Sequence, residues 1–219
     1  MRSKITEISK RFLVAPATGN DILRPVISRV VAATLMLCAL VLSGCVKDTE
    51  HQVVISTVDQ QMAVLKKGVP LATYPVSTSK FGLGDTPNSY RTPVGRLEVE
   101  KKIGDNAPMG MVFKNREQTG EVLAVDAPGR DPIVTRILWL KGTDSNTANA
   151  YDRNIYIHGT PEERNLGKPA SYGCVRMRSV DIAYVYSVVG WGAEVLILDI
   201  PLDRAVRYAQ QEKGTKTSL

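Results

Sequence analysis

Hydrophobic residues fall mainly into short runs that are separated by turn residues, a pattern typical of β-strands. The first three runs cover residues 53–56, 61–65 and 71–76, and Lys67-Gly68 between the second and the third is typical of a hairpin turn. Further runs predict strands over residues 95–102, 111–113, 121–124, 137–140, 155–158 and 194–199. Because these runs are short and spaced by Gly, Pro, Asn and Asp, we predict a mostly β fold, either a mainly antiparallel sandwich or a partly open barrel.

One segment near the C-terminus shows helical periodicity instead. Ser179 is placed to cap this main helix and Gly190 to end it, and one face carries Ile182, Val185, Tyr186 and Val189. Residues from about 203 onward are polar, so we predict a C-terminal tail over residues 201–219 that frays or forms a small surface helix. Residues 53–200 contain no internal repeat or linker, and we predict that they form a single domain large enough for its own core.

The N-terminus does not fit this pattern. Arg24 and Arg29 precede an apolar run over residues 30–42, which ends in Leu42-Ser43-Gly44-Cys45. A basic flank, a short apolar stretch and small residues before a cleavage site are typical of an export signal, and the run is shorter than the roughly 20 residues of a membrane-spanning helix. An uncleaved anchor or a buried helix is the alternative interpretation.

The cysteine directly after Ser43-Gly44 makes this segment resemble a bacterial lipoprotein signal. The resemblance implies that residues 1–44 are removed, that Cys45 becomes the lipidated first residue, and that residues 45–52 form a tether. The mature protein would then be an exported, membrane-anchored lipoprotein that faces the periplasm or the cell wall.

Removal of the signal changes the charge of the chain. The full sequence of 219 residues has a formal net charge of +6 and is 43% hydrophobic, as expected for a globular protein. Residues 1–44 hold six basic and two acidic residues, so the remainder has a net charge of +2. No basic cluster with interleaved aromatic residues remains, and we therefore predict no nucleic-acid partner. We expect a monomer.

Removal of the signal also leaves few residues for metal or disulfide chemistry. Cys38 lies in the apolar run and Cys45 is the predicted lipidation site, which leaves Cys174 as the one free thiol. An exported chain with one thiol cannot build a disulfide framework, and Cys174 with His51 and His158 is too small a set for a metal cluster. We predict no metal, no cofactor, and a thiol that is either inert or reactive.

The surroundings of Cys174 contain each group that turns a thiol into a nucleophile. His158 ends a predicted strand 16 residues upstream, Arg176 supplies a cation, and the helix at Ser179 begins shortly afterwards. Gly173 lets successive backbone amides point the same way, as an oxyanion site requires. A lone cysteine is more often a small buried hydrophobe, and a histidine at a strand end is more often structural. Their combination favours a nucleophile and its base.

Taken together, His158-Gly159-Thr160 and Ser171-Tyr172-Gly173-Cys174-Val175-Arg176 resemble the catalytic signature of the L,D-transpeptidase (YkuD-type) family. Upstream, Thr92-Pro93-Val94-Gly95 resembles the family's Thr-Pro-x-Gly segment, and the resemblance extends over about residues 52–200. It implies a β-rich fold and an exported enzyme that acts on peptidoglycan stem peptides in cell-wall cross-linking or remodelling. It also implies a thioester on the cysteine, which an amine of a second stem then resolves.

The resemblance assigns roles by position. Cys174 would be the nucleophile and His158 its base, and the carbonyl of Gly159 would orient the imidazole. Ser171 would either help to order the loop before the cysteine or contact the substrate. Arg176 would either order this loop or meet a carboxylate of the substrate, and the sequence leaves both roles open.

The amides of Tyr172, Gly173 and Cys174 would form the oxyanion hole, and here the chain departs from the family, which usually has histidine at position 172. If this position acts through its backbone, tyrosine is compatible with activity; if an imidazole must transfer protons there, activity is lost. The alternatives are an L,D-carboxypeptidase or a protein-anchoring enzyme of the same fold, or a non-catalytic wall-binding lipoprotein. Because His158 is retained, we favour an active enzyme.

Overall fold

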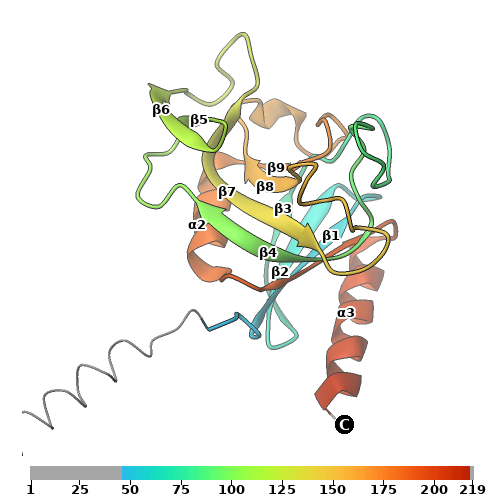
Figure 1. The fold of residues 1–219 in the computed structure, drawn as a ribbon. Helices are drawn as coiled ribbons and strands as arrows, with labels where there is room; N and C mark the ends of the chain where they lie inside the picture. Colours follow the sequence, from blue (N-terminus) through green and yellow to red (C-terminus); the bar gives the residue numbers. More distant parts are fainter. Residues whose placement is uncertain (1–45, 218–219) are drawn as a thin grey trace, which may run out of the picture. The chain divides into compact units, whose positions relative to one another are not determined.

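The computed structural model describes residues 46–217, and the framework of this part of the chain is one ten-stranded sheet (Figure 1). The strands are β1 (His51–Ser56), β2 (Gln61–Lys66), β3 (Val69–Pro75), β4 (Gly95–Ile103), β5 (Met111–Lys114), β6 (Glu117–Val122), β7 (Ile133–Gly142), β8 (Tyr156–Gly159), β9 (Val175–Met177) and β10 (Glu194–Leu198). A 3-10 helix and two α-helices complete the described elements: η1 (Glu163–Asn165), α2 (Ser179–Val188) and α3 (Leu202–Thr217). The predicted mostly β fold is confirmed, and the sheet stays open. The predicted signal over residues 1–44 and Cys45 lie outside the described residues.

The longest strand, β7, supports both the main sheet and a short side branch. The main order is β3-β2-β1-β10-β4-β7-β5-β6, and β8 pairs with β7 and then with β9 outside this path. Most neighbouring strands are antiparallel, but β1 pairs with β10 and β8 pairs with β9 in parallel. The side branch therefore consists of the strand that contains His158 and of the strand that begins directly after Cys174.

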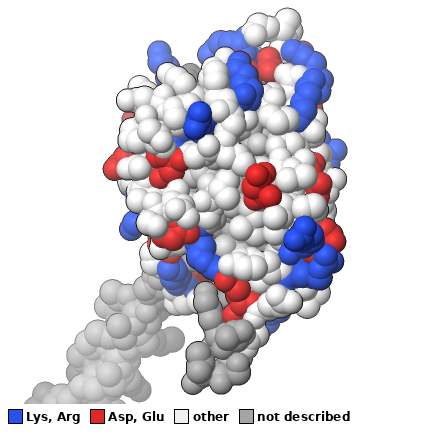
Figure 2. Space-filling model, turned by 90° about the vertical axis from the view of Figure 1, so that its right-hand side faces the viewer, with Lys and Arg blue, Asp and Glu red and all other residues white. Residues whose placement is uncertain are grey.

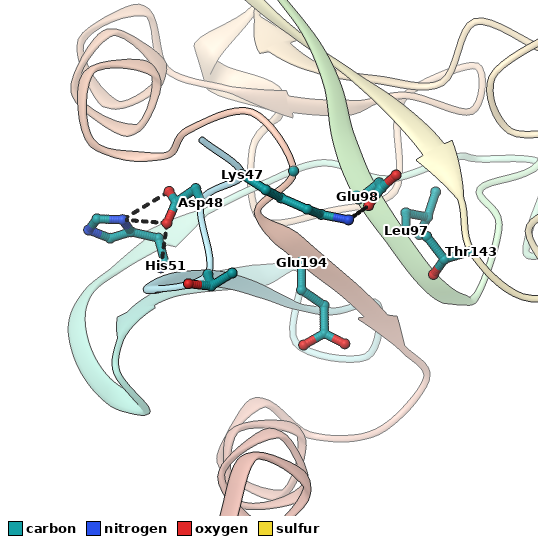
Figure 3. A pocket seen from close by; sticks show the side chains of 9 residues that line it. Lys47, Asp48, His51, Leu97, Glu98, Thr143 and Glu194 are labelled. Carbon is teal, nitrogen blue, oxygen red and sulfur yellow. Dashed lines mark hydrogen bonds and ion pairs between the residues drawn. The ribbon is translucent and has the colours of Figure 1, made fainter. Parts of the chain in front are cut away.

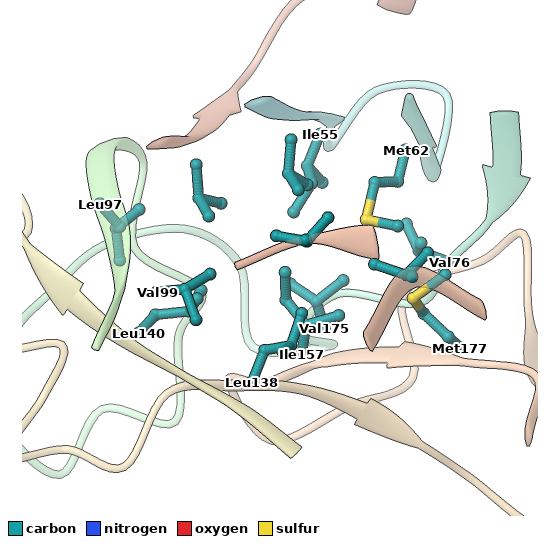
Figure 4. Packing of buried hydrophobic residues seen from close by; sticks show 14 of the residues in the cluster. Ile55, Met62, Val76, Leu97, Val99, Leu138, Leu140, Ile157, Val175 and Met177 are labelled. Carbon is teal, nitrogen blue, oxygen red and sulfur yellow. The ribbon is translucent and has the colours of Figure 1, made fainter. Parts of the chain in front are cut away.

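The main hydrophobic core is formed by residues from most strands of the sheet and from the inner side of α2, and Figure 4 shows how the strand residues meet in it. Ile157 from β8 and Val175 and Met177 from β9 enter it and are fully buried. Side chains alternate between the two faces of a strand, so the residues next to these three point to the opposite face. The core thus fixes which residues of β8 and β9 face away from it.

The predicted polar tail is a helix with a buried face. In α3, Leu202, Ala205 and Ala209 are buried against β1 and β2 and form a second core on the other side of the sheet. Small residues at helical spacing let the helix approach the strands closely, while its remaining positions stay polar. The tail therefore belongs to the fold over most of its length.

Two further predictions about local structure differ from the structure. The strand β9 was not predicted, because it has only three residues and its central position is charged, at Arg176. Ser179 is the first residue of α2 and not its cap; the cap is Arg178, and it makes no side-chain capping bond. The amide of Ser179 instead donates to the Glu163 carboxylate at 2.8 Å.

The surface of the domain is mixed in charge where Figure 2 shows it. Acidic and basic side chains are interspersed on that face around a broad uncharged area. Within residues 46–217, no helix combines the length and the apolar character that a bilayer-spanning segment needs.

Candidate active site

The parallel pairing of β8 with β9 brings the predicted nucleophile and base onto one face of the sheet. His158 pairs with Arg176 and Ile157 with Val175. Since Ile157 and Val175 enter the main core, His158 and Arg176 lie on the opposite face. Cys174, two residues before Arg176, packs there at the edge of a smaller buried cluster under β5 and β7. Such diagonal neighbours have Cα atoms on the order of 7–8 Å apart, a span that a cysteine and a histidine side chain can bridge.

His158 is buried and oriented by its own neighbour in the chain. The residue is only 5% exposed, and Nδ1 of its ring lies 2.8 Å from the carbonyl oxygen of Gly159. A carbonyl oxygen only accepts hydrogen bonds, so Nδ1 carries the proton and Nε2 is left as the free base. Burial lowers the pKa of His158 to about 4, so the imidazole is neutral near pH 7 and its Nε2 is unprotonated, although burial also makes it a weaker base than an exposed histidine.

The position of Gly159 leaves no room for a side chain. A Cβ atom there would lie 2.6 Å from the carbonyl oxygen of Val134 on the neighbouring strand β7. Because that contact is with backbone, it could be relieved only by moving the strands apart. The glycine therefore keeps its carbonyl, and with it the imidazole of His158, close to β7.

Burial of His158 predicts an acid-sensitive fold. A histidine whose pKa falls from 6.5 to about 4 on folding binds its proton more readily in the unfolded chain. It costs no stability above pH 6.5, and its cost grows as the pH falls toward 4, where it reaches about 3 kcal/mol. We expect the free energy of unfolding from urea titrations to fall by about 3 kcal/mol more for the parent than for His158→Gln over this range, because only the parent has this imidazole. Two parallel curves of stability against pH would contradict the prediction.

Cys174 holds its proton tightly in the resting protein. The side chain is half-buried, and Sγ lies 3.4 Å from the carbonyl oxygen of Asn154, to which the thiol donates. Burial raises the pKa of the thiol to about 11, and a hydrogen bond from the backbone of Tyr156 and the charges of Arg176 and Arg153 lower it too little to offset burial. The resting pair is therefore a thiol and a neutral imidazole, and the nucleophile forms only when the proton moves to His158.

The helix that follows the cysteine does not activate it. The sequence predicted that the N-terminus of α2 would support a thiolate at Cys174. The three residues of β9 and Arg178 separate the two, and the first helical amide is bonded to Glu163. Of the three activating groups predicted from the sequence, the histidine and the arginine share a sheet face with the cysteine.

The loop before Cys174 is held by side-chain hydroxyls. The Ser171 hydroxyl donates to the carbonyl of Cys174 at 2.6 Å and accepts the amide of Gly173 at 3.2 Å. The Thr92 hydroxyl donates to the carbonyl of Gly173 at 2.9 Å, and Gly173 has a φ of 118°, which favours glycine. The Gly173 amide would have to exchange its long bond to Ser171 for one to an oxyanion.

The side chain of Tyr172 belongs to a surface cluster. Tyr172 is 55% exposed, and its hydroxyl accepts a hydrogen bond from Nζ of Lys80 at 2.9 Å. Its ring centroid lies 5.4 Å from that of Phe81 and 6.1 Å from that of Tyr90, both of which come from the loop between β3 and β4. The position that is usually histidine in the resembled family thus uses its side chain for loop packing.

Arg176 is tied to a neighbouring loop. Its guanidinium lies 2.6 Å from Asp131, both side chains are largely buried, and Asp131 also accepts the hydroxyl of Thr160 at 2.6 Å. The backbone of Arg176 is bonded in both directions to Ser77. Of the two roles that the sequence left open, these contacts favour an ordering role, but the loop that Arg176 contacts through Asp131 is the one that precedes β7 and not the one before Cys174.

No sequence pattern marks a second buried ion pair near the thiol. Arg153 and Asp85 are 68 positions apart, yet their side chains are 2.7 Å apart and 7% exposed each. Arg153 also donates to the carbonyl of Arg91 at 2.6 Å, so it holds the β3–β4 loop against the segment before β8. The neighbouring Asn154, whose backbone carbonyl accepts a hydrogen bond from the Cys174 thiol, was likewise not predicted as a site residue.

Two cavities meet at Tyr172. One of about 340 Å³ is lined by residues that include Tyr90, Asn154 and Tyr172. The other, of about 540 Å³, is lined by residues that include Lys80, Tyr172 and Arg176. The residues that line them place clefts of ligand size beside the loop that carries Cys174. Among the described residues, no group of histidine, cysteine and acidic side chains has the arrangement of a metal site.

Comparison with known proteins identifies the family. A sequence model of the YkuD family, described as the L,D-transpeptidase catalytic domain, matches residues 50–197. The chain belongs to the L,D-transpeptidase (YkuD) family. This L,D-transpeptidase relationship supports a peptidoglycan-related transpeptidase function.

The relatives of this chain are distant. It is 29% identical over 160 residues to the probable L,D-transpeptidase YbiS of Escherichia coli K12, over 71% of this chain and 47% of the relative. It is 40% identical over 53 residues to the putative L,D-transpeptidase YqjB of Bacillus subtilis, over 24% of this chain and 30% of the relative. The chain therefore spans about half the length of YbiS. Among solved structures, L,D-transpeptidase 3 from Mycobacterium tuberculosis, in complex with a faropenem-derived adduct, has a TM-score of 0.46 at 19% identity, over 68% of this chain and 60% of the other.

Proposed function

We propose that this protein is an active cysteine acyltransferase that cross-links or remodels peptidoglycan through its stem peptides. The observation that carries the proposal is the shared face of Cys174 and His158, with Nδ1 of the histidine on the Gly159 carbonyl. An inert cysteine needs no oriented neutral imidazole on the same face of the sheet.

The reaction begins with proton transfer. The Cys174 thiol gives its proton to Nε2 of His158 while Sγ attacks the carbonyl carbon between the third, L-centred residue of a stem and its D-alanine. The oxyanion that forms is stabilised by backbone amides of the 172–174 turn. When the C–N bond breaks, His158 protonates the departing D-alanine amine, and the acyl group stays on sulfur as a thioester.

The second half reverses the roles. An amine of another stem loses a proton to His158 and attacks the thioester, and the C–S bond breaks to regenerate the Cys174 thiol. Water in place of the amine would make the protein an L,D-carboxypeptidase, and an amine of a protein would make it an anchoring enzyme. A non-catalytic wall-binding lipoprotein would carry out none of these three reactions.

Incubation with a disaccharide-tetrapeptide, followed by mass spectrometry, tests the proposed reaction. We expect cross-linked dimers that have lost one D-alanine. Tripeptide products without dimers would support the carboxypeptidase instead. A protein that forms neither, and whose Cys174 is not alkylated by iodoacetamide, would be the non-catalytic binder.

The exchange of Tyr172 for histidine should change acylation by imipenem less than about tenfold. The side chain of Tyr172 is engaged with Lys80 and Phe81, and an oxyanion formed on a β-lactam carbonyl would use backbone amides that both variants keep. Loss of a complete oxyanion donor typically costs on the order of 10²–10³ in rate. Stopped-flow acylation of the parent and of Tyr172→His measures the difference. A gain of two orders of magnitude in the variant would mean that the tyrosine impairs the enzyme.

We further propose that Cys45 is lipidated and that residues 1–44 are removed. The support is the sequence pattern of a basic flank, an apolar run and Leu42-Ser43-Gly44-Cys45. The intact mass of protein purified from membranes tests this directly, and Cys45→Ser should leave catalysis intact while membrane association is lost. A mature N-terminus at another residue would exclude this processing.

A further inference from the structure

The segment that follows the proposed lipidation site is bound to the domain from its third residue on. The backbone amide of Asp48 donates to the carbonyl of Trp191 at 2.7 Å, and its carboxylate accepts the amide of Gly190 at 2.7 Å. The same carboxylate accepts the amides of Glu50 and His51 at 3.0 and 2.9 Å and contacts the ring of His51 (Figure 3). Asp48 therefore fixes the chain to the end of α2 before β1 begins.

Two glycines at the end of α2 make this approach possible. A Cβ on Gly190 would lie 2.8 Å from the Cβ of Asp48, and one on Gly192 would lie 2.1 Å from the Cγ of Lys47. Lys47 in turn forms an ion pair with Glu98 on β4 (Figure 3). The predicted tether over residues 45–52 is therefore bound to the domain from Lys47 onward.

Because this segment is bound to the domain, the distance between the domain and a lipid anchor on Cys45 is short. Asp48 is three positions after Cys45, and a fully extended chain covers at most about 3.6 Å per position, or roughly 11 Å in all. If the acyl chains on Cys45 lie in a bilayer, the end of α2 must lie at the bilayer surface.

The side chains near this point suit such a position. Val46 is 89% exposed, Trp191 is 41% exposed and Tyr184 on the outer side of α2 is 49% exposed. Tryptophan and tyrosine are the residues enriched where the headgroups of a membrane meet water.

We propose that Val46, Trp191 and Tyr184 form a membrane-contact face that lies on the lipid headgroups when Cys45 is lipidated. This inference rests on the proposed lipidation and adds an orientation to it. The acyl chains supply the affinity for the membrane, and the aromatic side chains add a second contact that holds the domain in one orientation relative to the bilayer. In Figure 1 the described chain starts at the lower edge, whereas β8 and β9 lie toward the opposite side of the domain. The candidate catalytic face is thereby turned away from the bilayer and toward the wall.

The chain contains two tryptophans, Trp139 and Trp191, which makes the orientation measurable. The full chain is expressed with its signal, purified as the lipidated protein and bound to vesicles whose acyl chains carry bromine, a short-range quencher of tryptophan fluorescence. Trp139→Phe leaves Trp191 as the probe. Trp191→Phe leaves Trp139, which stacks on Tyr151 with ring centroids 4.3 Å apart, as the matched control.

We expect brominated lipid to quench Trp191 by at least about twofold relative to unbrominated lipid and to leave Trp139 unchanged, as interfacial placement of Trp191 alone requires. Equal quenching of both, or quenching of neither in protein that sediments with the vesicles, would overturn the orientation while lipidation stands. Parent protein that stays in the supernatant with Cys45→Ser would overturn the lipidation itself and the orientation with it.

Discussion

Cys174→Ala should lower the rate of dimer formation from disaccharide-tetrapeptide by at least about 10⁴-fold, because no other group among the described residues can form the thioester. The fold should persist, since the side chain is half-buried at the edge of its cluster and makes one long hydrogen bond, to Asn154. Near-UV circular dichroism and the thermal midpoint check the fold. A variant that keeps both its structure and more than about a tenth of the activity would exclude the cysteine as nucleophile.

His158→Gln should be nearly as damaging, and the two losses should not add. The histidine acts only by moving the proton of the Cys174 thiol and of the leaving amine, so it has no task once the thiol is absent. The rate of Cys174→Ala combined with His158→Gln should therefore equal that of Cys174→Ala alone. If the double variant is slower by the product of both factors, the two residues act independently and the proposed pair is wrong.

Asp131→Asn should destabilise the fold by about 3 kcal/mol, because it leaves the buried guanidinium of Arg176 without its counter-charge. Asparagine keeps a carbonyl that can accept the hydroxyl of Thr160, so the loss reports mainly on the charge. Urea denaturation measures it. The exposed pair of Asp203 and Arg207 on α3 provides the matched control, and Asp203→Asn should leave the midpoint unchanged. Equal effects of the two substitutions would mean that the Arg176 pair is no more important than a surface contact.

The same variant separates the two roles of Arg176. If the arginine orders the loop before β7, Asp131→Asn should lower kcat for all stem peptides alike, because the cleft is less well formed. If Arg176 binds a carboxylate of the substrate, release from Asp131 should lower KM for tetrapeptides relative to those with an amidated C-terminus. The ratio of kcat/KM for this matched pair of substrates decides between them.

The pattern of apolar positions predicted most of the sheet because its strands are short apolar runs bounded by turn residues. Ile155 and Ile157 enter the core as their spacing indicates, and the candidate base follows from the end of that run at His158. The strand β9 escaped this reasoning, because Arg176 interrupts its apolar pattern and is buried only through Asp131. The partner of Arg176 is distant in sequence, and no local pattern of residues predicts such a contact.

The candidate site shows the same division between local and distant information. The sequence motif placed Cys174, His158 and Gly159, but it predicted activation by a helix that in the fold begins beyond β9. The pairing of Arg153 with Asp85 and the thiol contact with Asn154 arise from loops that meet only in three dimensions. The buried face of α3 was missed because alanines, which suit close packing, carry little hydrophobic signal.

The position of β10 has a consequence for biosynthesis. This strand lies between β1 and β4 in the sheet, with Val53 paired to Val195 and Leu97 to the same residue from the other side. Until the last strand has left the ribosome or the export channel, β1 and β4 each present an unpaired edge, the arrangement most prone to association with other chains. Folding of the sheet is therefore a late event, and a product truncated before Glu194 should be captured by chaperones or degraded rather than accumulate as a partial domain.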